Sequence, residues 1–185
     1  MTYKTHIAFA TVVAAPFPLY LYAHQELTLG ELQLFLASCA IGALLPDIDH
    51  SRSFISQKIP IIPQLLSFYT KHRGFTHSLY GLLTVLFILV FVIHTFHLST
   101  VSAGGLFVGY LLHIAGDAMT LSGVSFCCKQ KLYLLPSFLR FKTGSFKERI
   151  FFYFFLLIFG AELFFVLFPQ KSEALLHMIF QLPYL

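Results

Sequence analysis

Five long apolar segments alternate with shorter polar stretches along this chain. Their approximate ranges are 6–23, 32–46, 78–98, 102–119 and 150–168. A helix needs about 20 mainly apolar residues to cross the hydrocarbon core of a bilayer, and each segment has or approaches that length. The pattern therefore predicts an all-α fold, in which residues 1–185 form a single integral-membrane domain, a bundle of about five transmembrane helices.

Prolines and glycines refine this prediction. Pro16 and Pro18 should kink the first segment, which bundled membrane helices tolerate, and Pro46 is the expected end of the second segment. The fourth segment carries glycines at spacings suited to close helix packing, at Gly104, Gly105, Gly109 and Gly116. The tail over about 172–185 has apolar residues at helical spacing, and we expect a short interfacial helix there.

Composition also favours a membrane protein. Hydrophobic residues make up 57% of the chain and charged residues 11%, whereas soluble domains have about 45–50% and about 25%. The mean hydropathy is +0.78. The chain contains 23 phenylalanines, too many to bury in a water-soluble core of this size. Three cysteines without CxxC spacing provide no disulfide framework.

Lysine and arginine side chains indicate the orientation in the membrane. They lie at Lys4 and in the loops 47–77 and 120–149, whereas the loops 24–31 and 98–101 have none. With five spans, all three basic segments face one side, which the positive-inside rule makes cytoplasmic, together with the N-terminus. The net charge of +4 is spread over these loops, so we expect contacts with membrane lipid and no nucleic-acid partner.

Histidine and aspartate residues gather at the same predicted face in four short clusters. The clusters supply these candidate metal ligands: His6, Asp47, Asp49, His50, His72, His77, His113 and Asp117. The orientation was derived from lysine and arginine alone, so the convergence of the clusters is an independent indication of one polar site. Ionisable residues within membrane spans are costly and point to a function.

Imidazole and carboxylate ligands together are typical of Zn, Mn or Fe(II) sites, with Zn as our first expectation. His113 and Asp117 are four residues apart, so both side chains project from one helix face. Asp47 and Asp49 lie in an expected turn and could bind one ion or bridge two. Because there are more candidate ligands than one ion needs, the sequence allows one or more divalent ions.

A metal with an open coordination position lowers the pKa of bound water and generates hydroxide near neutral pH. Arg73 lies between two candidate ligands and is always charged, so we expect it to bind a phosphate or carboxylate of a substrate. One of the surplus carboxylates, with Asp49 as our choice, would act as the general base.

Three motifs together resemble the YdjM-like family of bacterial and archaeal inner-membrane proteins. They are Pro46-Asp47-Ile48-Asp49-His50, His72-Arg73-Gly74-Phe75-Thr76-His77-Ser78 and Gly109-Tyr110-Leu111-Leu112-His113-Ile114-Ala115-Gly116-Asp117. The resemblance extends from His6 to about Pro136 and implies a multi-pass, metal-dependent hydrolase in the cytoplasmic membrane. Some members are labelled LexA-binding, but we carry no protein partner over from that label.

The resulting hypothesis is a membrane-bound, metal-dependent hydrolase of a phosphoester, such as a phospholipid headgroup at the cytoplasmic face. The alternative is a non-catalytic metal-binding regulator, which would need the same ligands but no open coordination position. A divalent-metal transporter is a weaker alternative. Its ligands should lie near mid-membrane on broken helices, whereas these lie at the predicted helix ends.

Overall fold

The computed structural model describes residues 1–50, 53–58, 75–126 and 131–168. The predicted tail helix at 172–185 and the candidate site residues His72 and Arg73 lie outside the described residues. Among those described, the regular structure is helical, with only two isolated β-bridges, Thr120–Phe141 and Val124–Leu132. The predicted all-α architecture is confirmed.

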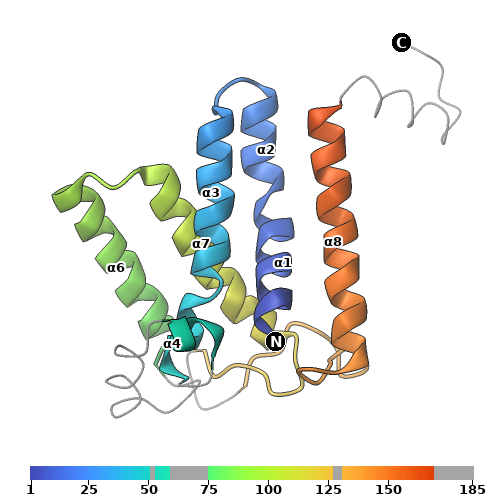
Figure 1. Cartoon of the computed structure of the whole chain (residues 1–185). Helices are drawn as coiled ribbons and strands as arrows, with labels where there is room; N and C mark the ends of the chain where they lie inside the picture. Colours follow the sequence, from blue (N-terminus) through green and yellow to red (C-terminus); the bar gives the residue numbers. More distant parts are fainter. Residues whose placement is uncertain (51–52, 59–74, 127–130, 169–185) are drawn as a thin grey trace, which may run out of the picture.

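The helices follow the predicted apolar segments, although the second helix ends at Gly42 and Pro46, its predicted end, lies inside the 3-10 helix that comes next (Figure 1). They are α1 Tyr3–Ala14, α2 Pro16–Ala23, α3 Leu29–Gly42, the 3-10 helix η1 Leu45–Asp49, α4 Phe54–Lys58, α6 Leu79–Phe96, α7 Thr100–Ala118 and α8 Phe146–Leu167. Within the described ranges, four spans are long and apolar enough to cross a membrane, namely α3 with η1, α6, α7 and α8. A fifth is available if α1 and α2, which bend by 44° at Ala15, form one broken span. This bend is the predicted proline kink.

Two helices begin earlier than predicted because polar side chains cap them. The hydroxyl of Thr28 accepts from the backbone N–H of Glu31, whose carboxylate accepts from the N–H of Thr28, so α3 starts at Leu29. The hydroxyl of Ser145 accepts from the N–H of Glu148, so α8 starts at Phe146. The first turn of α8 is therefore polar, which hydropathy alone did not reveal.

The packing of α7 against α3 depends on two of the four glycines. A Cβ atom at Gly109 would overlap the carbonyl oxygen of Cys39, and one at Gly105 would lie 2.5 Å from the carbonyl oxygen of Phe35. Both helices can approach this closely only because these positions have no side chain. The predicted close packing is confirmed there, whereas a Cβ at Gly104 would meet only Phe35 Cε2, at 4.0 Å.

The outward faces of α6 and α8 are apolar. Phe87 and Leu157 are each 73% exposed, and Phe91 is 56% exposed. Surfaces of this kind are unfavourable in water but match the hydrocarbon region of a bilayer. Figure 1 shows α6 on one side of the bundle and α8 on the other, with α1, α3 and α7 between them.

The polar clusters lie at one end of the bundle. The N-terminus of α1, the helix η1, the start of α6 and the end of α7 meet at the same end, opposite the α2–α3 and α6–α7 connections (Figure 1). The start of α8 also lies at this end. Alternating helix direction thus brings together residues that are more than a hundred positions apart.

The glycine contacts give a direct test of the packing between α3 and α7. We expect Gly109→Ala to destabilise the protein by about 1–3 kcal/mol, because the added methyl group must displace the backbone of α3. Thermal unfolding of the purified protein in detergent would measure this loss. Gly104→Ala is the matched control, since it makes the same change on the same helix where space is open. Equal stability of the two variants would contradict the described helix contact.

Candidate metal centre

Five of the eight predicted ligands converge at this end of the bundle. Among the described residues they form two overlapping groups, His6 with His113 and Asp117, and Asp47 with His77 and His113. Within each group the ligand atoms lie within 4.8 Å of one another. Four of the five residues are almost completely buried, whereas the side chain of Asp47 is 24% exposed. Asp47 is therefore the member closest to solvent.

The local structure explains how these side chains meet. His113 and Asp117 lie one turn apart on α7 and share a face, as their spacing predicts. His77 directly precedes the Ser78 cap of α6, and Asp47 lies in η1, where Pro46 occupies a first-turn position. His6 comes from the beginning of α1 and reaches the cluster from the other side of α7.

The tautomer of His113 follows from its hydrogen bond. Its Nδ1 lies 2.6 Å from the carbonyl oxygen of Ala43, which can only accept, so Nδ1 carries the proton. In the neutral ring, Nε2 then presents a lone pair to the cluster. A histidine that donates its outer nitrogen to a carbonyl in this way is typical of a metal ligand.

His77 has the same arrangement through a threonine. The hydroxyl of Thr76 donates to Asp49 Oδ2 at 2.7 Å, so it must accept from His77 Nδ1, which lies 3.0 Å away. The neutral ring of His77 also presents the lone pair of Nε2 inward. The two Nε2 atoms of His77 and His113 face each other at 3.2 Å. Two lone pairs at this distance repel each other unless a proton or a metal cation lies between them.

Two carboxylates complete the cage around these nitrogens. Asp47 Oδ1 lies 3.7 Å from His77 Nε2 and 3.6 Å from His113 Nε2, and Asp117 Oδ2 lies 3.7 Å from His77 Nε2. A tetrahedral zinc ion with ligands at about 2.0–2.1 Å holds those ligands about 3.3 Å apart. The separations of 3.2–3.7 Å among Asp47 Oδ1, His77 Nε2 and His113 Nε2 fit three ligands of such an ion.

His6 forms the second side of the cluster. Its ring stacks on that of His113, with centroids 3.7 Å apart, and its Nε2 lies 3.4 Å from Asp117 Oδ1. Its Nδ1 is buried and has no hydrogen-bond partner among the described residues. A buried polar atom without a hydrogen-bond partner is costly. In the neutral tautomer that leaves a lone pair on this nitrogen, it could instead bind a metal ion. The amino group of Met1 donates to the same Asp117 Oδ1 at 2.5 Å.

The remaining predicted site residues lie elsewhere. Asp49 is buried behind His77, with Oδ2 4.0 Å from His77 Nδ1, and contacts that ring through Thr76. His50 is half-buried and belongs to neither donor group. His72 and Arg73 lie outside the described residues.

Two supporting residues were missed in the sequence. Thr76 links His77 to Asp49, and the hydroxyl of Tyr110 donates to the carbonyl oxygen of Thr76 at 2.5 Å, which fixes the segment before α6 to α7. Both lie inside the motifs, Thr76 next to His77 and Tyr110 three residues before His113. This closeness in sequence to predicted ligands could have identified them as supporting residues.

Comparisons with known proteins agree with this architecture. The sequence profile of the family described as YdjM inner membrane protein matches residues 1–185. The chain is 36% identical over 153 residues to the uncharacterized protein YvsG of Bacillus subtilis, covering 81% of this chain and 86% of YvsG. It is 32% identical over 132 residues to the inner membrane protein YdjM of Escherichia coli, covering 67% of this chain and 63% of that protein.

The same values apply to the inner membrane protein YdjM of Shigella flexneri. No solved structure matches the chain at a significant level. The full-length match to the family profile and the apolar helices together show that this chain is a multi-pass inner-membrane protein of the YdjM family.

Proposed function

We propose that this protein is a membrane-bound, metal-dependent hydrolase that acts on a phosphoester, such as a phospholipid headgroup at the cytoplasmic face. The observation that carries the proposal is the buried cage in which His77 Nε2 and His113 Nε2 face each other beside the carboxylates of Asp47 and Asp117. Such a donor set, held at one end of a membrane bundle, suits a divalent cation.

Asp47, His77 and His113 would hold the ion. His113 has one lone pair to offer, because its Nδ1 donates to Ala43, so the two donor groups cannot both use it at once. This favours one principal ion, with His6 available for a second position. Nitrogen and oxygen donors together favour Zn, with Mn or Fe as alternatives.

A bound divalent ion with an open position supplies a nucleophilic hydroxide at neutral pH and polarises a phosphoryl oxygen. Asp47 would bind the ion through Oδ1, and in this proposal its second carboxylate oxygen is the general base, because this side chain is the partly exposed one in the cage. Asp49 acts through Thr76 to orient His77. We therefore assign it this role in place of the general-base role that we predicted from the sequence. Arg73 binds the substrate phosphate, a role proposed from the sequence alone.

The membrane-interface location supports a phospholipid as the substrate. Lys4, Arg140, Lys142, Lys147 and Arg149 belong to the same end of the bundle as the cage, and the positive-inside rule assigns this end to the cytoplasm. Basic residues near a bilayer attract anionic headgroups. A substrate phosphate in the inner leaflet would therefore be concentrated beside the proposed site.

The second candidate is a non-catalytic metal-binding regulator. A fourth ligand beside Asp47, His77 and His113, for example Asp117, whose Oδ2 lies 3.7 Å from His77 Nε2, would fill a tetrahedral coordination shell and leave no open position. Hydrolytic activity and metal binding must therefore be measured separately.

Thr76→Val tests the support of His77. It removes the hydroxyl that links His77 Nδ1 to Asp49, so we expect metal affinity to fall about 10–100-fold while the metal still binds at high concentration. Competition with a fluorescent chelator would measure the affinity. The control is Thr84→Val, the same change at an exposed position of α6 whose hydroxyl donates to Tyr80. Unchanged affinity in both variants would argue against this supporting role.

Asp117→Asn tests the reaction. We expect the metal-loaded wild-type protein to hydrolyse a phosphodiester substrate, either a chromogenic ester or a phospholipid in mixed micelles, and the variant to fall to background. Glu26→Gln is the matched control, because it neutralises an exposed carboxylate in the α2–α3 connection, at the end of the bundle opposite the cage. If metal-loaded wild-type protein hydrolyses none of these phosphoesters, the proposed reaction is wrong and the regulator is favoured.

Arg73→Ala separates substrate binding from metal binding. We expect turnover to fall about 10²–10³-fold, as when one donor to a developing anion is removed, with metal content unchanged. Arg73→Lys should recover part of the activity, since it restores charge without the bidentate geometry. Full activity in Arg73→Ala would exclude the proposed phosphate contact.

A further inference from the structure

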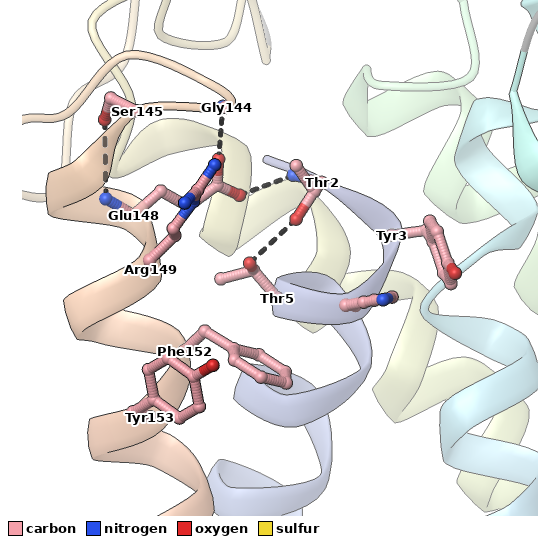
Figure 2. Close-up of a pocket in the computed structure, with 10 residues that line it drawn as sticks. Thr2, Tyr3, Thr5, Gly144, Ser145, Glu148, Arg149, Phe152 and Tyr153 are labelled. Carbon is pink, nitrogen blue, oxygen red and sulfur yellow. Dashed lines mark hydrogen bonds between the residues drawn. The ribbon is translucent and has the colours of Figure 1, made fainter.

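A groove runs between α1 and α8 on the side of α1 that faces away from the metal-ligand cluster. Its first part is a cavity of about 510 Å³ whose lining includes Thr2, Lys4, Gly144 and Arg149 (Figure 2). Its second part is a cavity of about 360 Å³ lined by Ile7, Thr11, Leu156 and Phe159, among others. Lys4 and Phe152 line both cavities, so the two are neighbours along the same pair of helices. We call them together the α1–α8 groove.

The polar part of the groove is built around Glu148. This side chain is only 2% exposed, and its carboxylate accepts from the backbone N–H groups of Thr2 and Gly144, each at 2.5 Å. Figure 2 shows Glu148 between the first turn of α1 and the loop that leads into α8. Its negative charge is therefore directed at backbone donors of both segments, and among the described residues no other acidic side chain lines this cavity.

The exposed charges of the polar part are both positive. Lys4 and Arg149 are exposed and line the cavity from α1 and α8 respectively, beside the aromatic ring of Tyr153. The Lys4 ammonium lies 5.9 Å from the centroid of the Tyr3 ring, which also lines the cavity. An ammonium and a guanidinium from two walls can bind the same phosphate, the guanidinium through two parallel hydrogen bonds. Tyrosine is typical of the level at which headgroups meet the hydrocarbon region.

The second part of the groove lacks such charges beyond Lys4. It follows α1 and α8 toward the middle of the bundle, and its walls are the apolar side chains named above together with the Thr11 hydroxyl, which is occupied by the carbonyl oxygen of Ile7. The outward side chains of α8 are also apolar and exposed, including Tyr153, Leu157 and Phe154. The groove therefore opens on the surface that fits contact with lipid.

We propose that the α1–α8 groove binds one anionic phospholipid, with its phosphate between Lys4 and Arg149 and an acyl chain along Ile7, Thr11, Leu156 and Phe159. The walls change from cationic at the end of the bundle to apolar toward its middle. The headgroup and acyl chain of a membrane lipid follow the same order. A soluble phosphate would occupy the first cavity only. A phospholipid has both an anionic group for the first cavity and an apolar chain for the second.

This lipid site does not depend on the proposed hydrolase. None of the residues that line the groove belongs to the donor groups of the metal-ligand cluster. Glu148 also ties the start of α1, four residues before His6, to the start of α8. A bound lipid would thus bridge the same two helices and stabilise their contact beside the cluster.

Native mass spectrometry of the detergent-purified chain would test the site by titration with phosphatidylglycerol and phosphatidylcholine. We expect one tightly bound phosphatidylglycerol per chain, and at least tenfold weaker binding in the double variant Lys4→Gln/Arg149→Gln. The matched control is Lys142→Gln/Lys147→Gln, which removes two positive charges at the same end but outside the groove. We expect less than a threefold effect in the control.

Thr11→Phe tests the apolar part, because a larger side chain would fill the second cavity while both cations remain. We expect it to weaken phosphatidylglycerol binding, and we expect glycerol 3-phosphate not to compete with the lipid. Equal losses in the two double variants, equal binding of phosphatidylcholine, or full competition by glycerol 3-phosphate would each overturn the proposal. Metal content, measured in the same samples, reports separately on the metal-ligand cluster.

Discussion

The facing nitrogens of His77 and His113 are the constraint on which the polar end of this bundle depends. Each ring is oriented by a hydrogen bond on its outer side, to Ala43 or to Thr76, so both inner lone pairs point at each other across 3.2 Å. Asp47 and Asp117 add negative charge to the same buried space. A proton or a metal cation between the two nitrogens would relieve the repulsion of their lone pairs. The close packing at Gly109 brings α7 near enough to Ala43 for the first of these hydrogen bonds.

Much of this architecture could be predicted from the sequence. Hydropathy predicts the spans because bilayer thickness sets their length. The distribution of lysine and arginine predicts that His6, Asp47, His77 and Asp117 lie at one face of the membrane. Helix starts were less accurate, since Thr28 and Ser145 cap α3 and α8 through local hydrogen bonds that hydropathy does not register. The orientation in the membrane stays a prediction.

Other features depend on contacts between distant segments and were not accessible. Asp47 and Asp49 are two residues apart, and only the geometry of η1 decides that one faces the cage and the other lies behind His77. The role of Thr76 depends on both neighbours at once. Glu148 gave no signal, because it joins backbone N–H groups of Thr2 and Gly144 rather than a side chain of complementary charge.

Metal content per chain is the most direct test of this account. Elemental mass spectrometry would be applied to protein purified without chelators, beside His113→Ala and the control His94→Ala at an exposed position of α6. We expect about one Zn, Mn or Fe ion per chain in wild type and control, and loss of that ion in His113→Ala. Absence of bound metal from folded wild-type protein, even after supplementation with these ions, would contradict it.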